Sequence, residues 1–361
     1  MRCRGVVRSK AISNLASRQY PQAIHSGHLR SQHPDPLYQA PIFRWKRSTC
    51  AITVNTATLQ YEDIILKVSD ARLAYGRTRA LNGINLEMFA GEILGLLGPN
   101  GAGKTSLIRC LSGRQKFESG TTQCSIAGDY HEHIGIVPQE IALYQDLTVN
   151  QNLAVFGRLH DITGRQLREL RRQTLHWAGL EDKARVLVRK LSGGMQRRLN
   201  IACSILHEPR ILFLDEPTVG VDPQSRERIY HMLETLLDIG TAILLTTHHL
   251  EEAEDRCDRI AIIDQGKILD TGTLEELMER SIGTEQQLRI QFSQPVRSVP
   301  RPLLLTEDRH EAVCGIENAS RDLPVVLQKV QAARLPMENM SLHSPTLQHM
   351  FLHLTGKELR E

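Results

Sequence analysis

Residues 64–282 alternate short apolar runs with amphipathic segments of helical period. Continuous apolar runs of four to six residues are typical of strands that are buried on both faces of a parallel sheet. Such runs occupy residues 93–97, 211–214 and 242–247. Capping residues open the amphipathic segments, as Thr148 does for one and Asp222 with Pro223 for another. The alternation predicts an α/β fold with a mainly parallel core sheet.

Two stretches depart from this alternation. Residues 64–68, 71–75 and 84–88 predict short strands separated by turn signals, and therefore an N-terminal antiparallel β-subdomain. From about residue 140 to residue 203 the pattern is helical, and Thr163 opens an arginine-rich segment there. We interpret residues 140–203 as an α-helical subdomain and its charges as a solvated face.

The N-terminal stretch, residues 1–60, differs from the rest in composition. It carries many arginines and lysines against a single acid, Asp35, and it has no sustained apolar period. We expect a disordered basic arm. A transit peptide is one alternative. The other is a start site placed too early, with initiation at a codon such as that of Val54.

The remaining chain divides into a central domain and an extension. We expect the central domain to span residues 61–283. Residues 284–361 predict a small α+β extension, with a strand at 287–292, a helix at 323–333 and a last helix capped by Ser344 and Pro345.

Net charge, cysteine content and the length of apolar runs bear on nucleic-acid binding, disulfide formation and membrane insertion. The formal net charge of +3 over 361 residues does not argue for nucleic-acid binding. The 7 cysteines are scattered and odd in number, which favours reduced thiols of a cytosolic protein. No apolar run approaches the roughly 20 residues that span a bilayer, so a membrane role would require a partner.

A glycine-rich loop follows the first buried run. Residues 98–105 read Gly-Pro-Asn-Gly-Ala-Gly-Lys-Thr between a predicted strand and a predicted helix. This is the P-loop spacing, in which backbone N–H groups and a helix N-terminus hold phosphates. Lys104 would reach the β- and γ-phosphates, and the Thr105 hydroxyl would ligate Mg²⁺. The predicted nucleotide-binding residues of the loop are Gly98, Pro99, Asn100, Gly101, Ala102, Gly103, Lys104, Thr105 and Ser106.

Two carboxylates, Asp215 and Glu216, end the second buried run. The carboxyl end of a buried parallel strand lies at the active crevice of an α/β sheet. Asp215 can hold the Mg²⁺ shell, and Glu216 can accept a proton from an attacking water.

Four other positions are ambiguous when each is taken alone. Tyr75, at a strand end, could stack on an adenine ring or be a half-buried strand residue. Gln139 and His248 each follow a strand, where structural or loop roles are commoner, although His248 could donate to a phosphate. Ser192 caps a helix, and the two glycines after it leave N–H groups open as a second anion site.

In order and spacing these residues resemble the ATP-binding cassette of ABC transporters, over about residues 64–282. The positions that match are Tyr75 as the adenine-stacking aromatic, residues 98–105 as Walker A, Gln139 as the Q-loop, residues 191–194 as the signature, residues 211–216 as Walker B, Asp222 in the D-loop and His248 as the switch histidine. Met195 stands where many signatures have Gln. That variant is common in exporters whose permease is a separate chain.

The resemblance implies a P-loop NTPase cassette that binds ATP and Mg²⁺. Glu216, His248 and Gln139 would be catalytic, and Gln139 would also ligate the metal with Thr105 and Asp215. The cassettes of this family work as head-to-tail pairs. Ser192, Gly193 and Gly194 of one copy would therefore close over the nucleotide of the other, with Asp222 beside them, so both copies contribute to each site.

The implied protein is a homodimeric ATPase that is peripheral to the cytoplasmic face of the inner membrane. It would power export of an unidentified substrate through an integral-membrane permease and would not bind nucleic acid. The alternative is a soluble ABC-family ATPase acting on ribosomes or DNA. Such relatives usually carry two cassettes or a long coiled-coil insertion, and neither is present here. The signature at 191–194 and His248 argue against a P-loop kinase.

Overall fold

The computed structural model describes residues 64–281, 286–306, 308–316, 318–343 and 346–355. The predicted basic arm, residues 1–60, and the predicted cap at Ser344 and Pro345 lie outside these residues. Within them the strands form three sheets. No helix of the described residues is long and apolar enough to cross a membrane.

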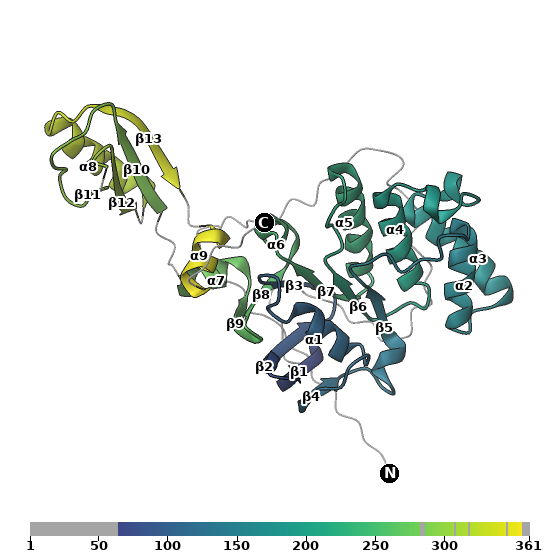
Figure 1. The fold of residues 1–361 in the computed structure, drawn as a ribbon. Helices are drawn as coiled ribbons and strands as arrows, with labels where there is room; N and C mark the ends of the chain where they lie inside the picture. Colours follow the sequence, from purple (N-terminus) through teal and green to yellow (C-terminus); the bar gives the residue numbers. More distant parts are fainter. Residues whose placement is uncertain (1–63, 282–285, 307, 317, 344–345, 356–361) are drawn as a thin grey trace, which may run out of the picture. The chain divides into compact units, whose positions relative to one another are not determined.

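The core is a six-stranded sheet in the order β5-β6-β7-β3-β8-β9 (Figure 1). Its strands are β3 (Ile93–Leu97), β5 (Ile134–Val137), β6 (Ile211–Asp215), β7 (Ala242–Thr247), β8 (Arg259–Asp264) and β9 (Lys267–Gly272). All neighbours are parallel except β8 and β9, which form an antiparallel pair. The prediction of a mainly parallel core sheet is therefore confirmed.

Strand register brings the functional ends of three strands together. Leu97 of β3 lies opposite Thr247 of β7, and Asp215 of β6 lies opposite Thr246. The carboxyl ends of β3, β6 and β7 therefore align at one edge of the sheet, where α/β proteins place their ligands.

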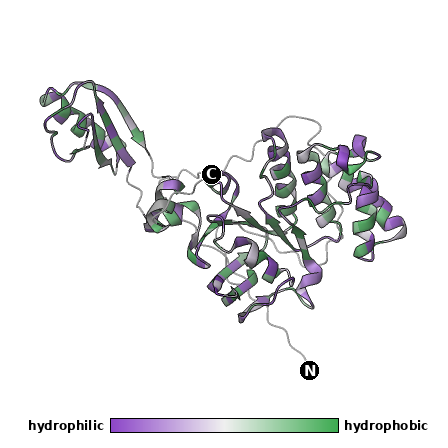
Figure 2. Ribbon diagram, in the orientation of Figure 1, coloured by the Kyte–Doolittle hydropathy of each residue, from purple (hydrophilic) through white to green (hydrophobic). Residues whose placement is uncertain are grey.

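Both faces of this sheet are covered, and alternate residues of each strand enter different cores. Leu212 and Leu214 pack with the helical side, whereas Ile211 and Phe213 pack with the β-subdomain side. All four side chains are fully buried. Figure 2 shows the corresponding hydrophobic strands between helices with hydrophilic outer faces. Burial on both faces explains why these runs are continuously apolar.

The remaining elements of the central domain follow the chain. The helices are α1 (Lys104–Leu111), α2 (Val149–Leu159), α3 (Gly164–Ala178), α4 (Gly193–Ser204), α5 (Pro223–Leu237), α6 (Leu250–Arg256) and α7 (Leu274–Ser281). Short 3₁₀ helices occupy Tyr130–His133, Glu181–Lys183 and Val188–Lys190. The predicted caps are confirmed at Thr148, which accepts from the N–H of Gln151, and at Asp222, which accepts from that of Ser225.

The antiparallel β-subdomain differs in detail from the prediction. It has the order β2-β1-β4, with β1 at Ile64–Tyr75, β2 at Thr78–Phe89 and β4 at Ser119–Cys124. The prediction of two strands at 64–68 and 71–75 is wrong, because β1 is continuous. Its register shifts between Val68 and Ala71, and Asp70 has a φ of 47°. The polar pair Ser69-Asp70 thus marks a bulge in one strand, not a turn between two.

The extension contains a second antiparallel sheet, in the order β11-β12-β10-β13. Its elements are β10 (Gln286–Phe292), β11 (Leu304–Leu305), β12 (Glu311–Ile316), α8 (Ala319–Ala332) and β13 (Met337–His343). The α8 helix begins four residues before the predicted start at 323, because Asn318 caps it by accepting from the N–H of Arg321. The last helix, α9 (Leu347–Thr355), packs its Phe351 with Ile262 of the central domain.

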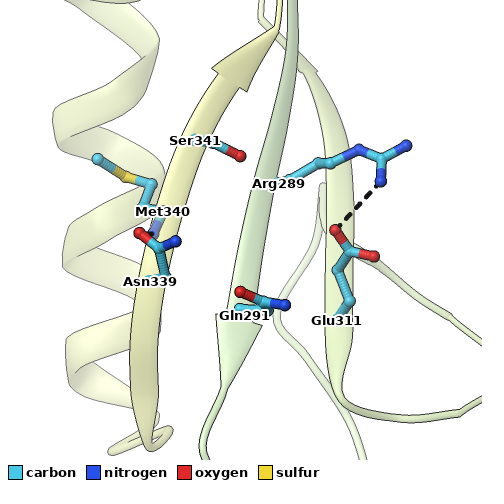
Figure 3. Close-up of a pocket in the computed structure, with 6 residues that line it drawn as sticks. All are labelled: Arg289, Gln291, Glu311, Asn339, Met340 and Ser341. Carbon is cyan, nitrogen blue, oxygen red and sulfur yellow. Dashed lines mark hydrogen bonds and ion pairs between the residues drawn. The ribbon is translucent and has the colours of Figure 1, made fainter.

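The outer face of this second sheet is polar. Figure 3 shows the Arg289 guanidinium pointing to Glu311, and these charged groups lie 3.4 Å apart. The shallow pocket around them has a volume of about 20 Å³. That is room for about one water molecule, so the pocket cannot hold a nucleotide.

Candidate functional site

The P-loop lies between β3 and the first turn of α1. Two of its glycines have left-handed backbones, with φ of 83° at Gly101 and 111° at Gly103. A Cβ at Gly103 would lie 2.5 Å from the carbonyl oxygen of Ala80. Side chains other than hydrogen are therefore excluded there by both conformation and space. A loop of this conformation can turn N–H groups toward an anion at the positive end of α1.

Lys104 is the first residue of α1, and its side chain is only 5% exposed. Its Nζ donates to the carbonyl of Gly98 at 2.6 Å and lies 3.6 Å from Oε1 of Glu216. Burial lowers the pKa of Lys104, and the charges of Glu216 and Asp215 partly offset that effect. The structure thus places an ammonium group between the P-loop and the end of β6.

Glu216 is the point on which the predicted catalytic residues converge. Its Oε2 accepts from Nε2 of Gln139 at 3.0 Å, and its Oε1 lies 3.1 Å from Nδ1 of His248. A carboxylate can only accept, so Nδ1 of His248 is the protonated ring nitrogen in this contact. Three predicted residues that lie far apart in the sequence, Gln139, His248 and Lys104, therefore meet at one carboxyl group.

The backbone of Glu216 is held in an uncommon conformation, with a φ of 46°. Its N–H donates to Oγ1 of Thr246 at 3.0 Å, and the same hydroxyl donates to Oδ1 of Asp215 at 2.7 Å. A non-glycine residue in the left-handed region persists only where its surroundings fix it. Thr246 is one such support, and sequence reasoning placed it only in a buried strand.

A second support that sequence reasoning missed is Arg197, whose side chain is 3% exposed. Its guanidinium donates to the main-chain carbonyls of Pro138 at 2.6 Å, Gln139 at 3.2 Å, Asp215 at 3.0 Å, Glu216 at 2.9 Å and Pro217 at 2.7 Å. Burial lowers the pKa of Arg197 to about 10, so the group stays charged near neutral pH. Its position on a charged stretch after the signature gave no signal of this role.

Other predicted residues lie apart from the Lys104–Glu216 contact. Tyr75 ends β1 with 45% of its side chain exposed. Ser192 and Gly193 are exposed, and the Ser192 hydroxyl accepts from the N–H of Met195 as the cap of α4. Asp222 is exposed as the cap of α5, and its hydrogen bonds to Ser225 lower its pKa. These surfaces are open to a further ligand or chain.

The rest of the loop also fits the predicted cradle. Asn100 and Gly101 are exposed at its tip, whereas Ala102 is buried against the β-subdomain side. Pro99 is half-buried, as are Thr105 and Ser106 in the first turn of α1.

The donor set suits a nucleotide with a hard cation. The cradle of left-handed glycines and the Lys104 ammonium fit the phosphates of ATP. A hydroxyl of Thr105, the amide oxygen of Gln139 and the carboxylate of Asp215 are oxygen ligands of the kind that Mg²⁺ prefers. No cluster of three or more His, Cys, Asp or Glu that could hold a metal occurs in the described residues.

Fold and site together define a P-loop nucleotide-binding protein, and comparisons with known proteins narrow the class. The model of the ABC transporter family matches residues 81–219. The linearmycin resistance ATP-binding protein LnrL of Bacillus subtilis is 36% identical over 314 residues, which cover 82% of this chain and 100% of that protein. Daunorubicin resistance ATP-binding protein DrrA3 of Streptomyces coeruleorubidus is 37% identical, covering 82% of this chain and 98% of that protein.

Solved structures give the same result. The chain is similar to cbiO1 of Clostridium perfringens, part of an ABC transporter complex, with a TM-score of 0.55 and 30% identity over 60% of this chain and 91% of that one. It is also similar to the dimeric cassette MJ0796, with a TM-score of 0.53 and 25% identity over 58% of this chain and 99% of that one. The chain belongs to the ABC transporter family, as an ATP-binding cassette, and the predicted fold class is confirmed.

Proposed function

We propose that this chain is the ATP-hydrolysing subunit of an exporter whose membrane-spanning permease is a separate chain. The observation that carries the proposal is the convergence of Gln139, His248 and Lys104 on the carboxylate of Glu216. The similarity to two resistance ATP-binding proteins over almost their whole length supports the transport part.

In this account, the P-loop residues 98–106 bind ATP, with Lys104 at the β- and γ-phosphates and Tyr75 against the adenine. Mg²⁺, when bound by Thr105, Gln139 and Asp215, supplies charge neutralisation at the phosphates. Glu216 takes the proton of the attacking water.

His248 supports the same step through its contact with Glu216. Its Nδ1–H donates to the carboxylate and orients it, and in the imidazolium form its Nε2–H also donates toward the charge that develops on the γ-phosphate.

The exposed surfaces of Ser192, Gly193 and Asp222 are accounted for by a second copy. In a head-to-tail homodimer, the N-terminus of α4 of one copy closes over the γ-phosphate held by the other. A two-fold axis gives two such composite sites from one sequence. The dimeric solved cassette supports the pairing of two copies. Because ATP would bind the closed pair more tightly, closure and reopening would move the permease.

The proposal places the protein at the cytoplasmic face of the inner membrane as a peripheral subunit. The rival function, a soluble ATPase acting on ribosomes or DNA, predicts a different fractionation. The full chain, tagged and expressed at its natural level, is expected to co-purify with one membrane protein from detergent-solubilised membranes. A variant with Tyr144→Ala and Leu159→Ala, which lacks two exposed apolar side chains on the helical side, is purified in the same way for comparison. Recovery of the chain only with ribosomes or DNA would contradict the proposal.

A further inference from the structure

Arg197 ties together two loops that carry site residues. A guanidinium has five N–H donors, and here its donors reach five different main-chain carbonyls. Two of the carbonyls, of Pro138 and Gln139, follow β5, and the other three belong to the last residue of β6, Asp215, and the two residues after it. We call this set of five hydrogen bonds the Arg197 clasp. It fixes the separation between the loop that carries Gln139 and the loop that carries Glu216.

The clasp holds the backbone of Glu216, which has an uncommon conformation. The left-handed φ of Glu216 is fixed on its N–H side by Thr246 and on its carbonyl side by Arg197. Burying a charged group is costly unless its donors are satisfied, and main-chain carbonyls satisfy the donors of the buried Arg197 guanidinium. Loss of the clasp would therefore let the Glu216 carboxylate and the Gln139 amide shift relative to the P-loop.

The helix that carries Arg197 connects the clasp to an exposed surface. Arg197 lies on α4, five residues after the cap Ser192. A 12-residue helix is a rigid element, so a displacement of its N-terminus also moves Arg197. The helix end is exposed, whereas the guanidinium is buried beside Asp215 and Glu216. The start of α4 therefore joins an exposed N-terminus to a guanidinium buried at the site.

We propose that Arg197 is a positioning residue that links the helix receiving the partner's nucleotide to the backbone of Gln139 and Glu216 in its own subunit. The inference rests on the proposed function, because it requires two copies paired head to tail. Closure of one site would be transmitted through α4 to the other. Lysine keeps the charge but has a single nitrogen with three donors, so it cannot reproduce the clasp.

Arg198 provides a matched control on the same helix. It also donates to main-chain carbonyls, those of Ala178 and Gly179 at the end of α3. It makes none of the contacts of the clasp. Arg198→Lys therefore reports the cost of loosening an arginine contact of α4 that does not reach Glu216.

The test uses mixed dimers of the full-length chain, purified through two different tags. One partner carries Glu216→Gln, so only the intact Glu216 of the other partner can act as the base. Arg197→Lys is placed either in the chain with the intact Glu216 or in the chain that already carries Glu216→Gln. Both dimers contain the same two substitutions, so a general folding defect lowers their rates equally.

The reference dimer carries Glu216→Gln in one chain and no substitution of Arg197 or Arg198. Relative to it, we expect kcat to fall about 100-fold only when Arg197→Lys shares a chain with the intact Glu216, with KM for ATP little changed. In the other arrangement, and with Arg198→Lys in either place, the rate should match the dimer carrying Glu216→Gln alone. Equal losses in both arrangements, or no loss in either, would overturn the proposal. If the reference dimer itself hydrolysed ATP at the full wild-type rate, the base role of Glu216 would fail instead.

Discussion

The Nδ1 atom of His248 lies 3.1 Å from Oε1 of Glu216. This contact orients the imidazole at the carboxyl ends of β6 and β7, beside the buried ammonium of Lys104. We predict that His248→Ala lowers kcat for ATP hydrolysis by about 10² to 10³, as is typical when one preorganised donor is removed. Steady-state kinetics would measure it, with KM for ATP little changed.

The control is the neighbouring His249→Ala, whose ring is 4.2 Å from that of His248. His249 makes no contact with Glu216 among the described residues and should leave kcat close to wild type. Equal effects of the two substitutions would show that the loop, not the His248 donor, matters.

Lys104 is predicted to contribute mainly to nucleotide affinity. Charge-assisted hydrogen bonds are worth about 1.5–3 kcal/mol, so Lys104→Ala should weaken ATP binding roughly 10- to 100-fold. Equilibrium titration with a fluorescent ATP analogue measures the change. Lys116→Ala, which removes an exposed lysine, is the control. Unchanged ATP affinity in Lys104→Ala would contradict the phosphate role.

Gly194 is predicted to be required for the packing of α4 on α5. A Cβ there would lie 2.2 Å from Oγ of Ser225, whereas a Cβ at Gly193 would have no neighbour within 4 Å. Overpacking of this kind costs about 1–3 kcal/mol, so Gly194→Ala should lower the free energy of unfolding. Gly193→Ala should not lower it, because alanine favours a helix over glycine. Urea unfolding measures the free energy of unfolding of both variants. Equal values would contradict the prediction, because they would show that Ser225 and α5 shift at no cost.

The sequence was sufficient for the parts of the fold that local rules control. Continuous apolar runs identified β3, β6 and β7, and Thr148 and Asp222 identified the starts of α2 and α5, because burial and capping act within a few residues. It was insufficient for β4, whose residues 119–124 are mostly polar and, among the described strands, pair with β1 alone. A strand of that kind is set by its partner and not by its own period.

The same limit applies to the site. Motif spacing named Lys104, Gln139, Glu216 and His248, and the structure brings these four together. Arg197 was invisible because its acceptors come from loops 59 and 20 residues away. An arginine on a helix is usually solvated, and only the fold shows that this one is buried.

His207 is predicted to make the protein sensitive to mild acid. Its Nε2 donates to the carbonyl of Ile134, and its ring stacks on that of His160 at 3.8 Å. Burial, followed by the charges of His160 and His133, lowers the pKa of His207 from 6.5 to about 4. The unfolded chain therefore binds the proton more readily, so the stability that neutral His207 provides is present above pH 6.5 and is lost as the pH falls toward 4.

His207→Gln should keep the donor to Ile134 and remove this dependence. Between pH 7 and pH 5 the wild type should lose roughly 2 kcal/mol more unfolding free energy than the variant. Urea unfolding at both pH values measures the difference, with the exposed His310→Gln as the control. Parallel pH profiles for wild type and His207→Gln would refute the assignment.

The central claim is that the P-loop of one copy and the α4 N-terminus of another form each complete site. Sedimentation velocity of the full chain carrying Glu216→Gln tests it most directly. The account predicts a monomer with ADP and a stable dimer with ATP, because binding is retained while turnover is lost. Adding Lys104→Ala or Ser192→Arg to that chain should abolish the ATP-dependent dimer. A chain that stays monomeric with saturating ATP, or dimerises equally with ADP, would contradict the account.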